Sequence, residues 1–208
     1  MGPGLFITFE GGEGAGKSTQ IAKLEAKLKG QGVDVLVTRE PGGTPQAEAI
    51  RSELVSGHIG RWSPLAETLL ISAARDSHLR EKIRPALERG MIVLCDRFMD
   101  STRAYQGAAG GVDPELISSL ERHVVGKTMP DLTLILDIDP DVGLARAKVE
   151  ENRFERKSKD FHSLLRMAYR EIAKLDPERC KIIDAEGTPE SVFAAIWQAV
   201  KSLLPSSQ

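Results

Sequence analysis

The fold of this 208-residue chain is decided by one short stretch near its start, Gly11-Gly12-Glu13-Gly14-Ala15-Gly16-Lys17-Ser18. The apolar residues 5–9 before it predict a buried strand, and residues 19–24 after it predict a helix. Glycines allow backbone N–H groups to turn inward around an anion, and the N-terminus of the next helix adds a partial positive charge. A strand, a glycine-rich loop and a helix in this order predict a phosphate-binding P-loop and a nucleoside triphosphate site.

Two groups of polar residues fit the chemistry of such a site. Within the P-loop, Lys17 can reach the outer phosphates and the hydroxyl of Ser18 can hold Mg²⁺. Asp96 and Arg97 follow the apolar run 91–95, which predicts a central strand of a parallel sheet. Ligands gather at the carboxyl ends of such strands, where an aspartate can hold Mg²⁺ and an arginine can clamp a phosphate bidentately.

The overall composition predicts one globular domain spanning residues 1–208. Hydrophobic residues make up 41% and charged residues 28% of the chain, which is ordinary for a soluble domain. A net charge of −2 argues against a nucleic-acid partner. No apolar run is long enough to span a membrane, so a cytoplasmic protein is expected. Cys95 and Cys180 lie in apolar runs and predict buried thiols rather than a disulfide or a metal pair.

Short apolar runs alternate with longer amphipathic segments along the chain. This alternation predicts an α/β fold with a five-stranded parallel sheet and helices on both faces. The expected strands are residues 5–10, 33–38, 91–96, 132–138 and 181–185. The expected helices lie near residues 17–30, 44–57, 64–90, 113–126, 140–150, 158–176 and 189–204. The charge-dense segment 148–159 between two helices predicts a short exposed lid, although a solvated helix end has the same composition.

Three further motifs are compatible with a second ligand but are weak on their own. Arg39 precedes a Pro-Gly-Gly turn at the end of the second expected strand, as in many ordinary turns. Tyr105 and Gln106 share a short helical stretch after Arg97, where they could contact a sugar and a base or simply pack. Arg75 lies four residues after Ile71, so the two side chains share one face of a helix and could form a base pocket.

Taken together, these motifs resemble the bacterial type of the thymidylate kinase (dTMP kinase) family over nearly the whole chain. The resemblance rests on Phe9-Glu10-Gly11 through Thr19, Thr38 through Thr44, Ala74-Arg75 with His78, Asp96-Arg97-Phe98 through Gly107, Asn152-Arg153-Phe154-Glu155, Phe161 and Tyr169. It implies a P-loop kinase fold, phosphoryl transfer from ATP to dTMP with Mg²⁺, a role in dTTP synthesis and a homodimer. The segment 64–90 is the candidate dimer face.

The resemblance also implies roles for individual residues. ATP would be bound by Gly11, Gly12, Glu13, Gly14, Ala15, Gly16, Lys17, Ser18, Thr19 and Arg146, with Arg146 lying against adenine. The acceptor would be bound by Glu13 near the sugar 3′-hydroxyl, Arg39 and Arg97 at the phosphate, Arg75 at a thymine carbonyl, Tyr105 under the sugar, and Ser101, Gln106 and Ile71 around them. Ser18 and Asp96 would hold the metal, and Lys17, Arg97 and a lid arginine would act in catalysis.

The sequence departs from the family pattern at Ile71, where the family usually places an aromatic ring against thymine. An aliphatic contact forfeits a stacking contribution of about 1–3 kcal/mol. A second feature is Gly14, where the eukaryotic form has an arginine. The catalytic arginine would then come from the lid, with Arg153 the first candidate and Arg156 the second.

Other functions remain as alternatives at this level. The departure at Ile71 leaves open another nucleoside monophosphate or deoxynucleoside kinase of the same fold. A P-loop GTPase would need an Asn-Lys-x-Asp guanine motif, which the sequence lacks, and its only Asp-x-x-Gly pattern is at residues 184–187, after the last expected strand. An ATP-binding scaffold without activity is disfavoured because Lys17, Ser18, Asp96 and Arg97 are all present.

Overall fold

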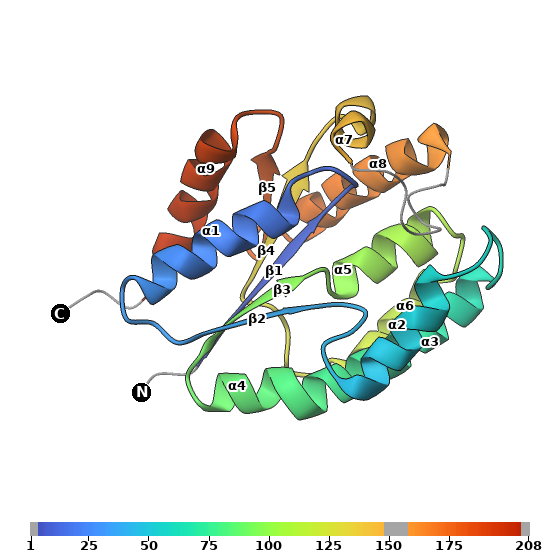
Figure 1. The fold of residues 1–208 in the computed structure, drawn as a ribbon. Helices are drawn as coiled ribbons and strands as arrows, with labels where there is room; N and C mark the ends of the chain where they lie inside the picture. Colours follow the sequence, from blue (N-terminus) through green and yellow to red (C-terminus); the bar gives the residue numbers. More distant parts are fainter. Residues whose placement is uncertain (1–3, 148–157, 205–208) are drawn as a thin grey trace.

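Five parallel strands form the centre of the computed structural model, which describes residues 4–147 and 158–204 (Figure 1). The sheet order is β2-β3-β1-β4-β5. Its strands are β1 (Leu5–Gly11), β2 (Val35–Arg39), β3 (Ile92–Asp96), β4 (Leu132–Asp137) and β5 (Cys180–Asp184). All four strand pairs are parallel, so every strand presents its carboxyl end at the same edge of the sheet. The expected sheet is confirmed, and each strand begins or ends within two residues of its predicted bounds.

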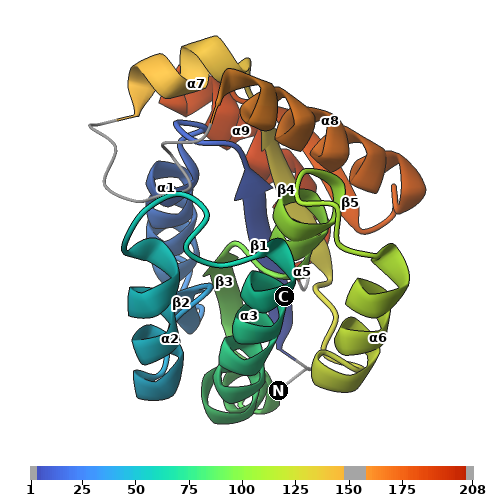
Figure 2. The same ribbon diagram turned by 90° about the vertical axis from the view of Figure 1, so that its right-hand side faces the viewer.

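The central strands are apolar on both faces because helices cover both sides of the sheet. In β1, Phe6, Ile7 and Phe9 are all fully buried, and β4 is buried along nearly its whole length. On one face α1 (Lys17–Lys29) and α9 (Pro189–Lys201) pack together against the sheet, while α8 (Lys159–Leu175) lies on the other face (Figures 1 and 2). A continuous apolar run therefore marks a strand that is buried twice, as the sequence predicted.

The remaining helices lie on the face of α8 or beyond the carboxyl ends of the strands (Figure 2). They are α2 (Pro45–Val55), α3 (Pro64–His78), η1 (Leu79–Ile83), α4 (Arg84–Glu88), α5 (Met99–Thr102), η2 (Arg103–Ala108), α6 (Pro114–Val124) and α7 (Pro140–Arg146). Several begin with a hydroxyl or carboxylate cap followed by proline, as at Thr44, Ser63, Asp113 and Thr188. Such caps accept hydrogen bonds from the first free N–H groups, which explains why the helix starts were predictable.

One predicted helix differs from the structure in its interior. Residues 64–90 were expected to form a single helix, but α3 and α4 are joined by the π-helical turn η1. This turn ends two residues before Pro85, which lacks an N–H and would clash with the carbonyl four residues earlier in a regular helix. The wider π turn accommodates the proline without ending the helical path.

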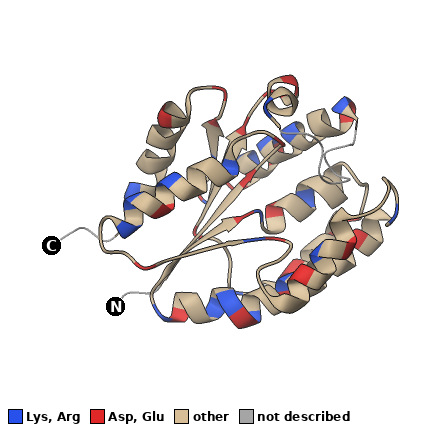
Figure 3. Ribbon diagram, in the orientation of Figure 1, with Lys and Arg blue, Asp and Glu red and all other residues tan. Residues whose placement is uncertain are grey.

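The two cysteines are buried and unpaired, as expected from their apolar surroundings. Among the described residues, no helix is both long and apolar enough to cross a membrane. Lysine, arginine, aspartate and glutamate are interspersed along the outer helices rather than gathered by sign (Figure 3).

Candidate active site

The P-loop connects the end of β1 to the start of α1 at the carboxyl edge of the sheet. Gly11, Gly14 and Gly16 have φ angles of 135°, 67° and 84°, a region that suits glycine. The Lys17 ammonium donates hydrogen bonds to the carbonyls of Gly11 at 3.3 Å and Gly12 at 3.1 Å, so it lies folded over its own loop. Burial, and then the nearby Arg97, lower the pKa of Lys17. An incoming anionic phosphate would oppose both effects.

Asp96 and Ser18 form the part of the site that suits a divalent cation. The Ser18 hydroxyl donates to Asp96 Oδ2 at 3.3 Å, and the buried Asp96 Oδ1 has no partner within the described residues. One hydroxyl and one carboxylate are typical protein ligands of Mg²⁺ at nucleotide sites, where phosphates and water complete the shell. No cluster of three His, Cys, Asp or Glu side chains that could hold a metal exists in residues 4–147 and 158–204. The donor set therefore fits Mg²⁺ bound together with a nucleotide.

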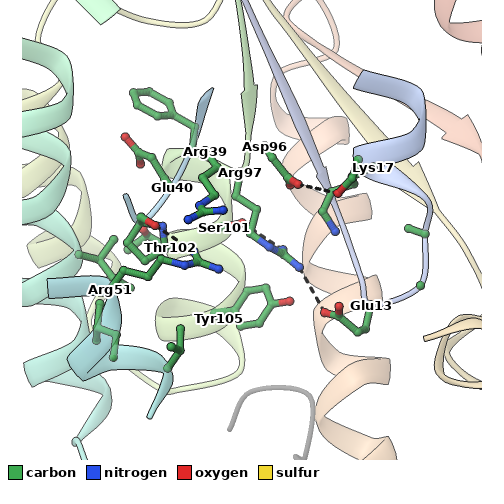
Figure 4. Close-up of a pocket in the computed structure, with 18 of the residues that line it drawn as sticks. Glu13, Lys17, Arg39, Glu40, Arg51, Asp96, Arg97, Ser101, Thr102 and Tyr105 are labelled. Carbon is green, nitrogen blue, oxygen red and sulfur yellow. Dashed lines mark hydrogen bonds and ion pairs between the residues drawn. The ribbon is translucent and has the colours of Figure 1, made fainter. Parts of the chain in front are cut away.

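Arg97 lies at the centre of the site, in a strained backbone conformation. Among the described residues, Arg97 is the only one other than glycine with a positive φ angle, which is 67°. Its backbone N–H donates a hydrogen bond to the Phe9 carbonyl at 2.9 Å. Its guanidinium donates to the Gly11 carbonyl at 3.0 Å and lies 3.6 Å from the Glu13 carboxylate (Figure 4). Such strain is kept where the surrounding contacts fix a side chain for function. Here it turns the arginine from β3 toward the P-loop.

Two arginines line the side of the cleft formed by β2 and α2. Arg39 ends β2 next to Asp96 in the sheet register and forms an exposed ion pair with Glu48 at 3.1 Å. Arg51, on α2, donates to the Pro41 carbonyl at 2.9 Å and also lines the cleft. The sequence predicted Arg39 but not Arg51. Its position on α2 carries no motif, and only the close approach of α2 to the 41–43 turn places it in the site.

Arg75 is buried deep in the cleft, not solvated on a helix surface. It is 3% exposed, and its Nε donates to Glu40 Oε2 at 2.7 Å while Nη2 donates to Thr102 Oγ1 at 3.0 Å. His78 Nδ1 lies 3.0 Å from the other Glu40 oxygen. Glu40 and Thr102 were not predicted as site residues. The position of Glu40 beside Arg39 at the end of a strand is the signal that could have indicated it.

The far end of the cleft is lined by Ile71, Tyr105 and Gln106. The Tyr105 ring lies 5.0 Å from the Arg97 guanidinium and packs edge-on against Phe161 at 5.8 Å. Gln106 donates to Glu67 at 2.8 Å, and its buried Oε1 lacks a partner within the described chain. Ile71 joins Leu54 as an aliphatic lining of this end. The chamber thus combines apolar walls with a polar group that is free to accept a hydrogen bond.

At the opposite end, Arg146 is fixed by two backbone carbonyls. Its Nη1 donates to Ala185 at 2.8 Å and its Nη2 to Glu186 at 2.7 Å. These contacts tie the end of α7 to the loop that follows β5. A guanidinium held along its edge leaves its flat face for stacking, which is how arginine packs against planar rings.

The predicted residues come together in one cleft of about 590 Å³ (Figure 4). The predicted residues that line it are Glu13, Gly14, Ala15, Gly16, Lys17, Ser18, Thr19, Arg39, Ile71, Arg75, Asp96, Arg97, Ser101, Tyr105, Gln106 and Arg146. Gly11 and Gly12 form the start of the P-loop beside it. Residues 148–157 of the expected lid, with Arg153 and Arg156, lie outside the described residues, and α8 begins at Lys159.

Comparison with known proteins identifies the family. The family model described as "Thymidylate kinase" matches residues 9–196. The thymidylate kinase of Caulobacter vibrioides is 57% identical over 202 residues, covering 96% of this chain and 97% of that protein. The one from Afipia carboxidovorans is 53% identical over 99% of this chain and 92% of its own length.

A solved structure agrees with these relatives. The crystal structure of thymidylate kinase from Ehrlichia chaffeensis has a TM-score of 0.80 and 34% identity, covering 96% of this chain and all of that one. The match confirms the P-loop kinase fold predicted from the sequence. With its P-loop, its paired Asp96 and Arg97 and these relatives over nearly its whole length, the chain belongs to the thymidylate kinase family.

Proposed function

We propose that this enzyme transfers the γ-phosphoryl group of ATP to dTMP, giving dTDP and ADP in the route to dTTP. The family and its close relatives support this reaction rather than another nucleoside monophosphate kinase activity. The observation that carries the proposal is the single cleft that joins the P-loop to the chamber around Arg75 and Tyr105. A donor phosphate and an acceptor phosphate could meet there beside Arg97.

The chemistry needs positioning and positive charge more than a general base. The second pKa of a phosphate monoester is about 6, so the attacking acceptor oxygen is already an anion near neutral pH. That oxygen forms a bond to the γ-phosphorus while the bond to the β–γ bridging oxygen breaks, and the electron pair leaves on ADP. Lys17 and Arg97 would stabilise the charge on the transferring group, because both line the cleft.

Ser18 and Asp96 would hold Mg²⁺ with the phosphates of ATP, since the unpaired Asp96 Oδ1 and the neighbouring hydroxyl suit it. Bound there, the cation would neutralise charge on the phosphates of ATP. Arg146 would lie against adenine, held in place by the Ala185 and Glu186 carbonyls. We place the remaining catalytic arginine in the lid, with Arg153 as the candidate, because Gly14 provides none.

On the acceptor side, the roles that the family resemblance implies are compatible with the positions of these residues in the cleft. Arg39 and Arg97 would bind the dTMP phosphate, with Arg51 as a third cation near them. Glu13 lies beside Arg97 and would face the sugar 3′-hydroxyl. The remaining acceptor contacts would be Arg75 on a thymine carbonyl, Tyr105 and Ser101 along the sugar, and Gln106 and Ile71 around the base.

We also propose that the chain is one domain, acts in the cytoplasm where its nucleotide substrates occur, and forms a homodimer through α3. On this helix Leu65 and Leu69 lie one turn apart and are 48% and 49% exposed. Exposed leucines at this spacing form an apolar stripe, which is typical of a helix that packs against a partner.

A coupled ADP-release assay across dTMP, dUMP, UMP, CMP, AMP and GMP tests the activity. We expect the highest kcat/KM for dTMP and no turnover without Mg²⁺. Lys17→Ala should lower kcat by about two orders of magnitude or more, as loss of a preorganised charge partner does. The matched control is Lys23→Ala, since Lys23 lies on the same helix and pairs with Glu190 on the surface. A higher kcat/KM for any ribonucleotide than for dTMP would overturn the proposal.

A further inference from the structure

A chain of buried hydrogen bonds holds Arg75 from two sides. Glu40 accepts from Arg75 Nε at 2.7 Å, and Thr102 accepts from Nη2 at 3.0 Å. Nη1, the remaining nitrogen of the guanidinium, has no hydrogen-bond partner in the part of the chain that the structure describes, and Arg75 lines the cleft. Because the guanidinium is planar, fixing two of its nitrogens also fixes the direction of the third.

Glu40 is itself held by His78. One carboxylate oxygen of Glu40, Oε2, contacts Arg75, and the other, Oε1, lies 3.0 Å from His78 Nδ1. On its other side, His78 Nε2 lies 2.7 Å from Thr38 Oγ1. A carboxylate can only accept, so Nδ1 carries the proton toward Glu40, and Thr38 can donate to Nε2. His78 is fully buried and does not line the cleft, so it can act on a ligand only through Glu40. Glu40 is 4% exposed and lines the cleft beside Arg75.

The backbone turn after Glu40 closes over the same histidine. A side-chain carbon added to Gly43 would lie within 2.6 Å of His78 Cδ2 and 2.8 Å of Thr38 Oγ1. The 41–43 turn therefore packs directly on the His78 ring. Arg39 and Glu40 are consecutive, so one segment carries a phosphate-side arginine and the carboxylate that orients Arg75.

We propose that Glu40, His78 and Thr102 are positioning residues that aim Arg75 Nη1 at the base of the acceptor and thereby set its selectivity. This inference rests on the proposed function, in which Arg75 meets a pyrimidine carbonyl. An N–H donor held in one direction discriminates strongly between a carbonyl oxygen and an amino group at the same position. A guanidinium free to rotate would accept either base with less discrimination.

Two substitutions at position 78 separate positioning from simple packing. The amide of His78→Asn reaches about as far as Nδ1 and can still donate to Glu40, whereas that of His78→Gln reaches toward Thr38 instead. We expect His78→Gln to lower the ratio of kcat/KM for dTMP over dCMP at least about tenfold, and His78→Asn to restore most of it. The KM for ATP should stay within about twofold in both. The control is His123→Gln on the exposed face of α6.

Thr102 provides an independent test from the other side of Arg75. Thr102→Val removes the acceptor of the Nη2 hydrogen bond, while Thr102→Ser keeps it. The dTMP/dCMP ratio should fall in the valine variant and be retained in the serine variant. Unfolding curves of all four variants verify that each is folded under the assay conditions.

Arg75→Ala serves as the reference that separates the two hypotheses. If it lowers the dTMP/dCMP ratio while His78→Gln and Thr102→Val leave the ratio unchanged, the positioning role is wrong and the proposed base contact stands. If Arg75→Ala itself leaves the ratio unchanged, Arg75 does not discriminate between the bases, and both the proposed base contact and the positioning role are wrong. An equal loss in His78→Asn and His78→Gln with a raised KM for ATP would indicate a general packing role and also overturn the inference.

Discussion

At the scale of single residues, the buried carboxylate of Glu10 holds the loop that carries Arg97. It accepts hydrogen bonds from the Phe98 N–H at 2.8 Å, the Ser101 hydroxyl at 2.6 Å and the Tyr169 hydroxyl at 3.1 Å. Burial, and after it the charge of Asp100, raise the pKa of Glu10 from 4.5 to about 7. A residue near the end of β1 thus holds the turn after β3 that carries Arg97.

This pKa predicts a specific pH dependence of stability. Because the folded-state pKa lies above the unfolded one, the native state binds more protons between pH 4.5 and about 7. The contribution of Glu10 to the free energy of unfolding is therefore fully present below pH 4.5. It is lost as the pH rises toward 7, by up to about 3 kcal/mol. Glu10→Gln keeps an accepting oxygen toward Phe98 and a donor toward Tyr169 but does not titrate. We expect the variant to gain stability relative to wild type from pH 5 to pH 8.

Urea unfolding of the variant and of the wild type at several pH values measures this difference in the free energy of unfolding. The other titrating groups are the same in both proteins, so their contributions cancel in the difference. Ser163→Ala, on α8 and outside the network, controls for the effect of a substitution as such. A difference between Glu10→Gln and wild type that does not change with pH would contradict the assignment.

The residues that could be predicted are those that follow a strand in the sequence. Asp96 and Arg97 come at the end of an apolar run, and Lys17 and Ser18 follow another such run across the glycine-rich loop. Parallel strands bring such positions to one edge. The hydrogen bonds that Glu40 accepts from Arg75 and His78 join positions 35 and 38 residues apart, across the packing of α3 on the 41–43 turn. No local pattern carries that information, so the sequence did not indicate the side chains that hold Arg75.

At the scale of elements, α7 docks on the P-loop through a contact between two backbones. A side-chain carbon on Gly14 would lie 2.6 Å from the Gly143 carbonyl carbon, and one on Gly143 would overlap the Glu13 carbonyl oxygen. Gly143 lies inside α7, the helix that ends at Arg146. The close approach leaves no room for a side chain at position 14, which agrees with a catalytic arginine placed outside the P-loop.

Gly143→Ala should weaken ATP binding although alanine favours helix by about 1 kcal/mol over glycine. The new methyl group would push the P-loop away from α7 and disturb the cradle around the phosphates. We expect a rise of several fold or more in the KM for ATP with a smaller change in the KM for dTMP. The control is Val142→Ala, an exposed position of the same helix. An unchanged KM for ATP in Gly143→Ala would show that α7 and the P-loop can move apart without affecting ATP binding, and the prediction would be wrong.

Most element boundaries could be predicted because caps and prolines mark them locally. Thr44, Ser63 and Thr188 each accept a hydrogen bond from the N–H three residues on, and each precedes a proline. The π-helical turn at Leu79–Ile83 could not be predicted, since a proline in a helical pattern is compatible with an end, a kink or a π turn. Packing of Leu79 and Ile83 into the core selects the continuous path.

At the scale of the whole molecule, the sheet joins three hydrophobic clusters into one body. The first packs α1 and α9 on the sheet, and the second and third fill the opposite face beneath α4 and α8. Neighbouring residues of one strand serve different clusters, as Phe6 and Ile7 do in β1. Disruption of either face therefore removes support from the other, and we expect one cooperative unit.

The two tryptophans allow this to be measured, because they lie in distant parts of the fold. Trp197, on α9, packs against the first cluster, while Trp62, just before α3, donates to the Glu53 carbonyl at 3.2 Å. In Trp62→Phe the fluorescence reports on α9, and in Trp197→Phe it reports on the α2–α3 region. Each fluorescence midpoint in urea should agree with the circular dichroism midpoint of the same variant within about 0.2 M. Comparing two signals within one variant cancels the effect of the substitution on stability. Loss of the Trp62 signal at a clearly lower urea concentration would mean that α2 and α3 unfold as a separate unit, and the single-domain proposal would be wrong.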